Sequence, residues 1–192
     1  DDTQMPPSPP PNPMTPTELP LFPLGTVLFP GALLPLQLFE LRYLQMIGEC
    51  ERQGTGFAVV TLTQGREVHR PGASAEQFET LGTRVHIERI ERPQAGLVMV
   101  WCRGVEKISI QNTRQRSDGL WTGQVHALPP EPAVQVPEDL QHLSVQMHEA
   151  LTQLSQQPSE VPLWPEAWRL QDCSWLSNRW GELLPLPLPM QY

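Results

Sequence analysis

The chain has 192 residues, of which 39% are hydrophobic and 18% are charged, and its formal net charge at pH 7 is −8. This length provides for one domain with a hydrophobic core, or for one domain and a small appendage. The negative charge disfavours indiscriminate binding to nucleic acids or to anionic membranes. The charge is uneven, however, because residues 42–116 hold eleven Lys and Arg against eight Glu.

The first 18 residues form a proline-rich segment. They contain seven prolines and only two large apolar residues, too few to offset the entropy cost of ordering the chain. We therefore predict a disordered tail over residues 1–18.

Residues 19–39 are uncharged and mostly apolar, a length that would suit a membrane-spanning helix or a secretion signal. The stretch from residue 19 to residue 40 contains four prolines and two glycines, which exclude a continuous helix. A signal peptide needs an earlier positive charge, and the first cation is Arg42. The alternation of Leu34, Leu36 and Leu38 predicts short strands, with a tight turn at residues 29–31.

A helix is predicted next, over residues 39–53. Apolar residues recur along it at helical spacing and predict one buried face, made of Phe39, Tyr43, Met46, Ile47 and Cys50. Gly54 and Gly56 end the helix. About seven strands are then predicted for the β portion as a whole, the later ones near residues 57–63, 83–91, 96–102, 105–111 and 120–128, with a turn at residues 118–119. Ile90 breaks the alternation of its strand, which indicates a bulge.

The remainder of the chain is predicted to be helical. A proline-rich linker occupies residues 127–137, and apolar residues at 3-4-4-3 spacing from Leu140 to Leu154 predict an amphipathic helix. A second helical segment is rich in tryptophan, with Trp164, Trp168, Trp175 and Trp180.

The sequence lacks the motifs that would indicate an enzyme or a metal protein. It has no phosphate-binding glycine loop, no zinc-protease helix and no nucleophile elbow. A Ser–Lys catalytic dyad would have to use Lys107, the only lysine, and Ser109 lies two residues away on the same strand. Such neighbours are common in strands that have no catalytic role. The three cysteines are widely spaced, which favours free thiols in a reducing compartment, and we predict a cytoplasmic protein without catalytic, cofactor-binding or metal residues.

At residues 19–47 the sequence reads LPLFPLGTVLFPGALLPLQLFELRYLQMI. This stretch closely resembles the opening of the N-terminal substrate-binding domain of the ATP-dependent Lon protease, which also occurs in stand-alone Lon-domain proteins. Later markers follow in the order of that family, at residues 57–62, 81–83, 104–110 and 175–186. Leu41 and the pair Lys107-Ile108 depart from the family pattern, without consequence for the fold.

The resemblance implies an α+β fold. A PUA-like β-barrel with one inserted helix is expected over residues 19–130, and a linker with a small C-terminal helical subdomain over residues 131–192. In Lon this domain recognises substrates, while ATP hydrolysis and the Ser–Lys protease site belong to later domains that these residues do not include. The implied function is therefore a non-catalytic module that binds polypeptide segments.

Two questions of binding stay open at this point. PUA-like barrels often bind RNA, so an RNA-binding module is the alternative, favoured by the basic window at residues 42–116 and disfavoured by the overall charge. The predicted contacts for a polypeptide are aromatic groups near the junction of barrel and helices: Tyr43, Trp121, Trp175 and Trp180. No membrane association is expected.

Overall fold

The computed structural model describes residues 17–64, 77–156 and 168–184 of the chain. These residues form six strands, three α-helices and one short 3-10 helix. The strands are β1 (Thr17–Leu24), β2 (Leu33–Leu38), β3 (Phe57–Gln64), β4 (Gln77–Gln94), β5 (Leu97–Gln115) and β6 (Trp121–Ala127). The helices are α1 (Leu41–Gln53), the 3-10 turn (Glu138–Leu140), α2 (Gln141–Ser155) and α3 (Cys173–Leu183). A sheet-dominated α+β fold is thereby confirmed, with α1 inserted between β2 and β3.

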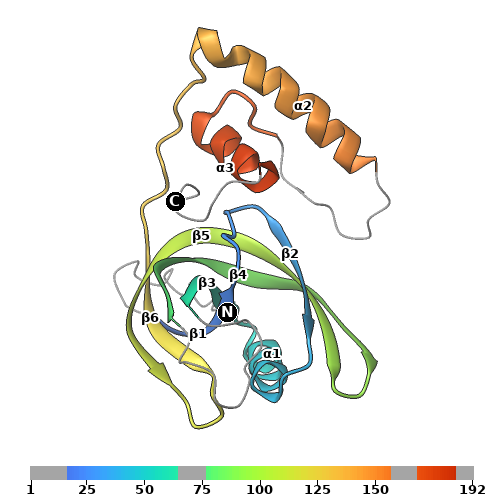
Figure 1. The fold of residues 1–192 in the computed structure, drawn as a ribbon, viewed down its shortest axis with the longest axis vertical. Helices are drawn as coiled ribbons and strands as arrows, with labels where there is room; N and C mark the ends of the chain where they lie inside the picture. The colour runs from blue at the N-terminus through green and yellow to red at the C-terminus, as the bar shows by residue number, and fades with distance from the viewer. Residues whose placement is uncertain (1–16, 65–76, 157–167, 185–192) are drawn as a thin grey trace, which may run out of the picture.

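The strand pairings close on themselves (Figure 1). β1 lies between β3, with which it is parallel, and β6, with which it is antiparallel. β3 also pairs with β4, β4 pairs with β5, and the second half of β5 pairs with β6, all antiparallel. The first half of β5 pairs instead with β2. Five strands thus form a ring, and β2 is attached outside it.

The described residues contain fewer strands than predicted because two predicted segments, residues 96–102 and 105–111, form the single strand β5. Val85 pairs with Gly104 and Arg84 pairs with Glu106, so Val105 is the extra residue of a bulge. A bulge keeps the strand continuous, whereas a turn would have ended it. The bulge predicted near Ile90 is also confirmed, by a shift of register between Ile87 and Arg89.

The two faces of the ring contribute to different cores. Leu21 and Val60 belong to the cluster inside the ring, together with Ile108 and Ile110 from β5. Neighbouring residues of the same strands point outward and join the larger cluster, which also contains the buried side chains of α1 and β2. The alternation of side chains along each strand therefore produces a ring filled from within and covered by α1 from outside.

Helix α1 begins two residues later than predicted and exposes a different residue. Phe39, predicted on its buried face, precedes the N-cap Glu40 and is 58% exposed. Arg42 is buried instead, because its guanidinium donates to Glu40 Oε2 and to the carbonyl oxygen of Gly119, both at 3.1 Å. The end of the helix is as predicted, since Gly54 adopts a left-handed conformation with φ of 63°.

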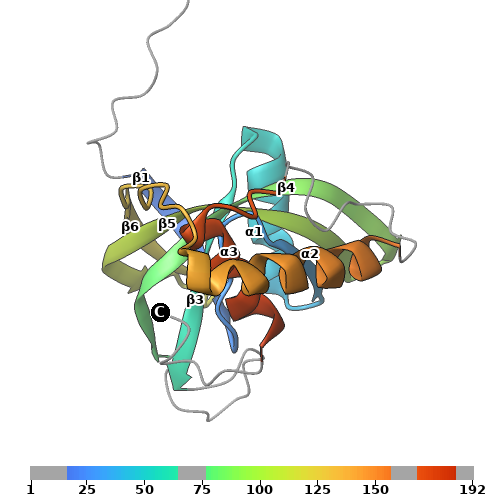
Figure 2. The ribbon, with the colours of Figure 1, turned by 90° about the horizontal axis from the view of Figure 1, so that it is seen from above.

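Helices α2 and α3 form a third core of their own, at the end of the molecule opposite α1 (Figures 1 and 2). Met147 and Leu151 of α2 pack there with Trp175 and Leu176 of α3. Within the described parts of the chain, each helix is too short or too polar to span a bilayer. Trp164 of the predicted tryptophan-rich segment lies outside the described residues.

The start of the chain differs from the prediction in one respect. Thr17 and Glu18, assigned to the disordered tail, are the first residues of β1, because they pair with Val125 and Gln124 of β6. Residues 1–16 of the predicted tail lie outside the described residues.

Candidate binding groove

A groove opens at the end of the ring where β3 begins. Its volume is about 850 Å³. Leu19, Ile108 and Val125 form an apolar floor, since they belong to the core inside the ring. The walls come from the end of α1, from residues 54–56 and from residues 84–90 of β4. The groove exists because β1 and β4 both continue past Phe57, the first residue of β3, with which Val85 of β4 pairs.

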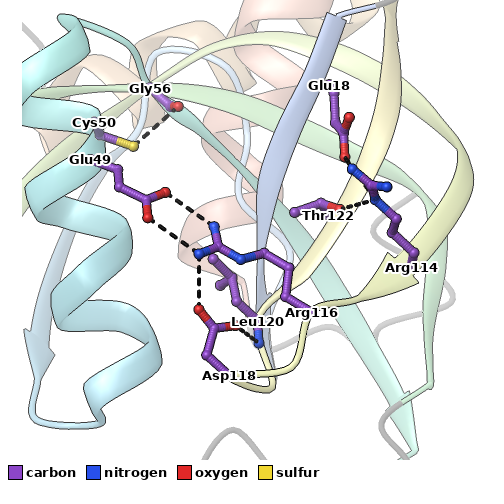
Figure 3. Close-up of polar contacts among 9 residues, drawn as sticks. All are labelled: Glu18, Glu49, Cys50, Gly56, Arg114, Arg116, Asp118, Leu120 and Thr122. Carbon is purple, nitrogen blue, oxygen red and sulfur yellow. Dashed lines mark hydrogen bonds and ion pairs between the residues drawn. The ribbon is translucent and has the colours of Figure 1, made fainter.

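A second cavity of about 690 Å³ continues from this groove between β1 and α1. The two share Thr17, Leu19, Cys50 and Thr55 as lining residues, so we treat them as one feature, the β1 groove. Figure 3 shows side chains around this second part, with Glu49 and Cys50 of α1 on one side and Arg114 of β5 and Arg116, just after β5, on the other. The β1 groove therefore has one long wall made by the first residues of β1.

Ion pairs span the walls of the β1 groove (Figure 3). Arg114 donates to Glu18 at 2.7 Å and lies 3.4 Å from the hydroxyl of Thr122. Hydrogen bonds from Arg114 and then Thr122 lower the pKa of the Glu18 carboxyl. Arg116 connects Glu49 of α1 with Asp118, at 3.1 and 3.0 Å. These contacts hold the end of β5 against both β1 and α1.

Every charged side chain that lines the β1 groove is engaged in such a pair. Arg84 contacts Glu106 at 2.8 Å, and Glu88 contacts Arg103 at 2.8 Å. His86 lies 3.5 Å from Glu88. The remaining lining charges pair within the chain as Arg92–Glu51 and Arg89–Glu91. The groove thus presents compensated charge around an apolar floor.

The thiol of Cys50 lies at the junction of the two parts. It donates to the carbonyl oxygen of Gly56 at 3.4 Å, and burial raises its pKa (Figure 3). A raised pKa keeps the thiol protonated at neutral pH, which makes it a poor nucleophile. The described residues contain no group of three His, Cys, Asp or Glu side chains placed to hold a metal ion. The arrangement suits binding by shape and backbone contacts.

The four aromatic residues predicted to bind are not brought together. Tyr43 is 3% exposed in the outer core, with its ring centroid 4.6 Å from that of Phe22. Trp121 packs at the ring interior, 5.4 Å from Phe78. Trp175, also 3% exposed, and Trp180 share the helical core. Their role in binding stays a prediction.

The β1 groove has no signature in the sequence. Its lining residues are mostly small, polar or ordinary strand residues, and they come from five separate elements. Only Gly54 and Gly56, which bracket Thr55, mark the place where the chain turns away from the sheet.

Among the described residues, most basic side chains of the window at residues 42–116 are paired with acidic ones. Eight of its basic residues form ion pairs with acidic side chains: Arg42, Arg84, Arg89, Arg92, Arg103, Lys107, Arg114 and Arg116. Several of the acidic partners, among them Glu18, Glu40 and Glu131, come from outside the window. The excess of basic residues that the sequence shows in this window is therefore largely compensated by acidic side chains nearby in the fold.

Comparison with known families matches residues 18–192 to the substrate-binding domain of ATP-dependent protease La (LON). The chain belongs to this family. The Lon N-terminal domain protein from Xanthomonas campestris has a similar crystal structure, with a TM-score of 0.67 and 28% identity over 91% of this chain and 87% of that one. The N-terminal domain of the Mycobacterium avium complex Lon protease aligns over 72% of this chain and 68% of that one, with 13% identity and a TM-score of 0.49. Comparison with curated proteins finds no match.

The family match accounts for nearly all of the 192 residues, which therefore consist of this domain. The Xanthomonas structure is also that of a Lon N-terminal domain protein, and it aligns with this chain over most of both lengths. The sequence-based assignment to the Lon substrate-binding domain is confirmed, and with it the assignment to a substrate-recognition type of module.

Proposed function

We propose that this domain is a non-catalytic module that binds polypeptide segments in the β1 groove. The family to which the chain belongs is named for substrate binding, which supports the choice of a polypeptide ligand. The observation that supports the β1 groove as the binding site is its shape and lining: it is open, its floor is apolar, and the charged side chains of its walls form ion pairs with one another or with neighbouring residues. Concave sites of this size, mostly apolar with a few placed polar groups, are typical of ligand binding.

The proposal includes a finer description of the domain. We assign the ring to the PUA-like barrels, and we treat the helices as a small C-terminal subdomain, with the domain limits predicted from the sequence. The closed strand pairing and the separate helical core support this description. We also propose a cytoplasmic location, which the three free cysteines support.

The predicted aromatic residues have different parts in this proposal. Trp121 and Trp180 are partly exposed, so they remain candidates for direct contact with a long polypeptide. Tyr43 and Trp175 are almost fully buried, and we propose that they support the binding surface from within the cores.

Binding is tested with a fluorescently labelled, permanently unfolded model protein, titrated with the full chain and followed by fluorescence anisotropy. We expect saturable binding at micromolar concentration. Thr55→Trp places a large ring in the groove from an exposed position that lines both parts, and we expect at least a tenfold loss of affinity. The matched control is Ala95→Trp, at an exposed turn outside the groove, which should bind as the parent does.

The same titration with single-stranded RNA tests the alternative. Tight RNA binding that weakens steeply with salt, together with no binding of the unfolded protein, would replace the proposed function with RNA recognition. Equal binding of the unfolded protein by the parent and by Thr55→Trp would move the site away from the β1 groove.

A further inference from the structure

The first residues of β1 have one backbone edge paired and one edge open. β1 pairs with β6 from Thr17 to Leu21, whereas its pairing with β3 starts only at Leu21. On the side of β3, residues 17–20 have no strand partner within the described parts of the chain. The same four residues line the β1 groove. The long wall of the groove is therefore the open edge of a strand.

The segment that precedes β3 is held away from this edge. Gly54 turns the chain with φ of 63°, and the N–H of Thr55 donates to the carbonyl oxygen of Cys50 at 3.0 Å. Gly56 lies so close to β4 that a Cβ atom there would come within 1.8 Å of the carbonyl oxygen of Val85. Because Gly56 is pressed against β4, β3 does not extend backwards along β1.

The open edge is also held rigidly. Arg114 of β5, the strand beyond β6, donates through two nitrogen atoms to Glu18 Oε1, at 3.1 and 2.7 Å. β1 is also paired with β6 itself, from Thr17 to Leu21. An edge that is already ordered costs little conformational entropy when it binds a partner.

The charges of the groove indicate what kind of partner fits. Since each charged lining side chain already has a counter-ion in the chain, a charged ligand would have to compete with an existing pair. An uncharged segment keeps these pairs intact and covers the apolar floor of Leu19, Ile108 and Val125. Strand addition supplies its affinity through main-chain hydrogen bonds.

We propose that residues 17–20 of β1 bind an extended, uncharged polypeptide segment by strand addition, so that the bound segment continues the sheet where β3 begins. This inference rests on the proposed function and specifies its ligand and its mode of binding. Neighbouring strands lie about 4.8 Å apart, so the bound segment would occupy the groove directly beside β1.

The test uses a fluorescein-labelled peptide of eight residues, four alternating Thr-Val pairs with blocked termini, and two versions with N-methyl groups. One version is methylated at the Thr positions and the other at the Val positions. Alternate N–H groups of a strand point to opposite sides. We therefore expect one version to lose at least tenfold in affinity and the other to change less than threefold. Amide hydrogen exchange should slow, when the parent peptide binds, at those of residues 17–19 whose N–H groups face away from β6.

The possible failures separate the two proposals. If both methylated versions bind like the parent peptide, strand addition is wrong while the proposed function stands. Strand addition is also wrong if the peptide does not bind, whereas the unfolded protein binds and Thr55→Trp weakens that binding. If neither the peptide nor the unfolded protein binds, the proposed function itself fails.

Discussion

The guanidinium group of Arg179 donates a hydrogen bond of 2.6 Å to the carbonyl oxygen of Pro30, 149 residues earlier in the chain. Arg179 is fully buried, pairs with Glu182 at 2.6 Å, and lies 5.5 Å from the ring of Trp175. The side chain of Arg179 thus contacts Trp175 in the helical core and also the turn before β2. It is one of the contacts that hold α3 against the turn before β2.

Replacing Arg179 with Met should destabilise the protein by about 3–5 kcal/mol, because Glu182 loses its buried counter-ion. The measurement is urea unfolding followed by tryptophan fluorescence. Arg169→Met is the matched control, since Arg169 also pairs with an acid three residues later but is mostly exposed. It should cost less than about 1 kcal/mol. Equal effects of the two substitutions would contradict the structural role of Arg179.

Gly181→Ala tests a second contact, between α3 and the turn before β2. A Cβ atom at Gly181 would lie 2.7 Å from Phe29 Cζ, so we expect a loss of about 1–3 kcal/mol from overpacking. Phe29→Leu in the same chain should recover part of this loss. Gly48→Ala is the control, because its nearest neighbour is a side-chain atom at 3.6 Å; it should stabilise α1 by about 0.5–1 kcal/mol. A neutral Gly181→Ala would show that α3 does not pack on Phe29.

The buried thiols predict a loss of stability at alkaline pH. Burial raises the pKa of Cys50 and that of Cys102. Because the pKa of each thiol is raised in the folded state, its contribution to stability is fully present below the pKa of an unfolded cysteine, about 8.5. This contribution decreases as the pH rises above that value. A thiol contributes a slope of up to about 1.4 kcal/mol per pH unit where it is ionised in the unfolded state and still protonated in the folded one. The slope between pH 8.5 and 9.5 should decrease in Cys102→Ala and be unchanged in Cys173→Ala.

The contact between the linker and β5 predicts a smaller effect in acid. The hydrogen bond from Lys107 lowers the pKa of Glu131, with Nζ 2.6 Å from Oε1. Because this pKa is depressed, the contribution is present above the unfolded value, about 4.3, and is lost as the pH falls through the folded value. Glu131→Gln should reduce stability at pH 7 by less than about 1 kcal/mol, and its difference from the parent should shrink as the pH falls below about 4.3. Glu138→Gln, at an exposed glutamate of the same region, should show no such difference.

The elements that the sequence predicts well are those set by local physical rules. The alternation of Leu34, Leu36 and Leu38 is enough to indicate β2, and the left-handed Gly54 ends α1 where predicted. The turn predicted at residues 118–119 connects β5 and β6, with Gly119 at φ of 86°. The family motif at residues 19–47 likewise depends only on the order of residues.

The candidate site could not be predicted in the same way. The sequence points to aromatic residues, and the structure distributes them among three separate cores. The β1 groove depends on where β3 starts relative to β1 and β4, which is a property of register between distant segments. The spacing of residues within one segment of the sequence does not reveal the register between two distant strands.

The family, the sheet-dominated fold and the positions of most helices and strands can be derived from the amino-acid order alone, because each follows from local patterns or from one continuous motif. Which side chains those elements bury depends instead on contacts between distant segments. Phe39 has the stronger apolar character and is exposed, while Arg42 is buried. The physical reason is that Arg42 finds the carbonyl oxygen of Gly119, 77 residues away, and the cost of burying a charge is offset only when such a partner is in place.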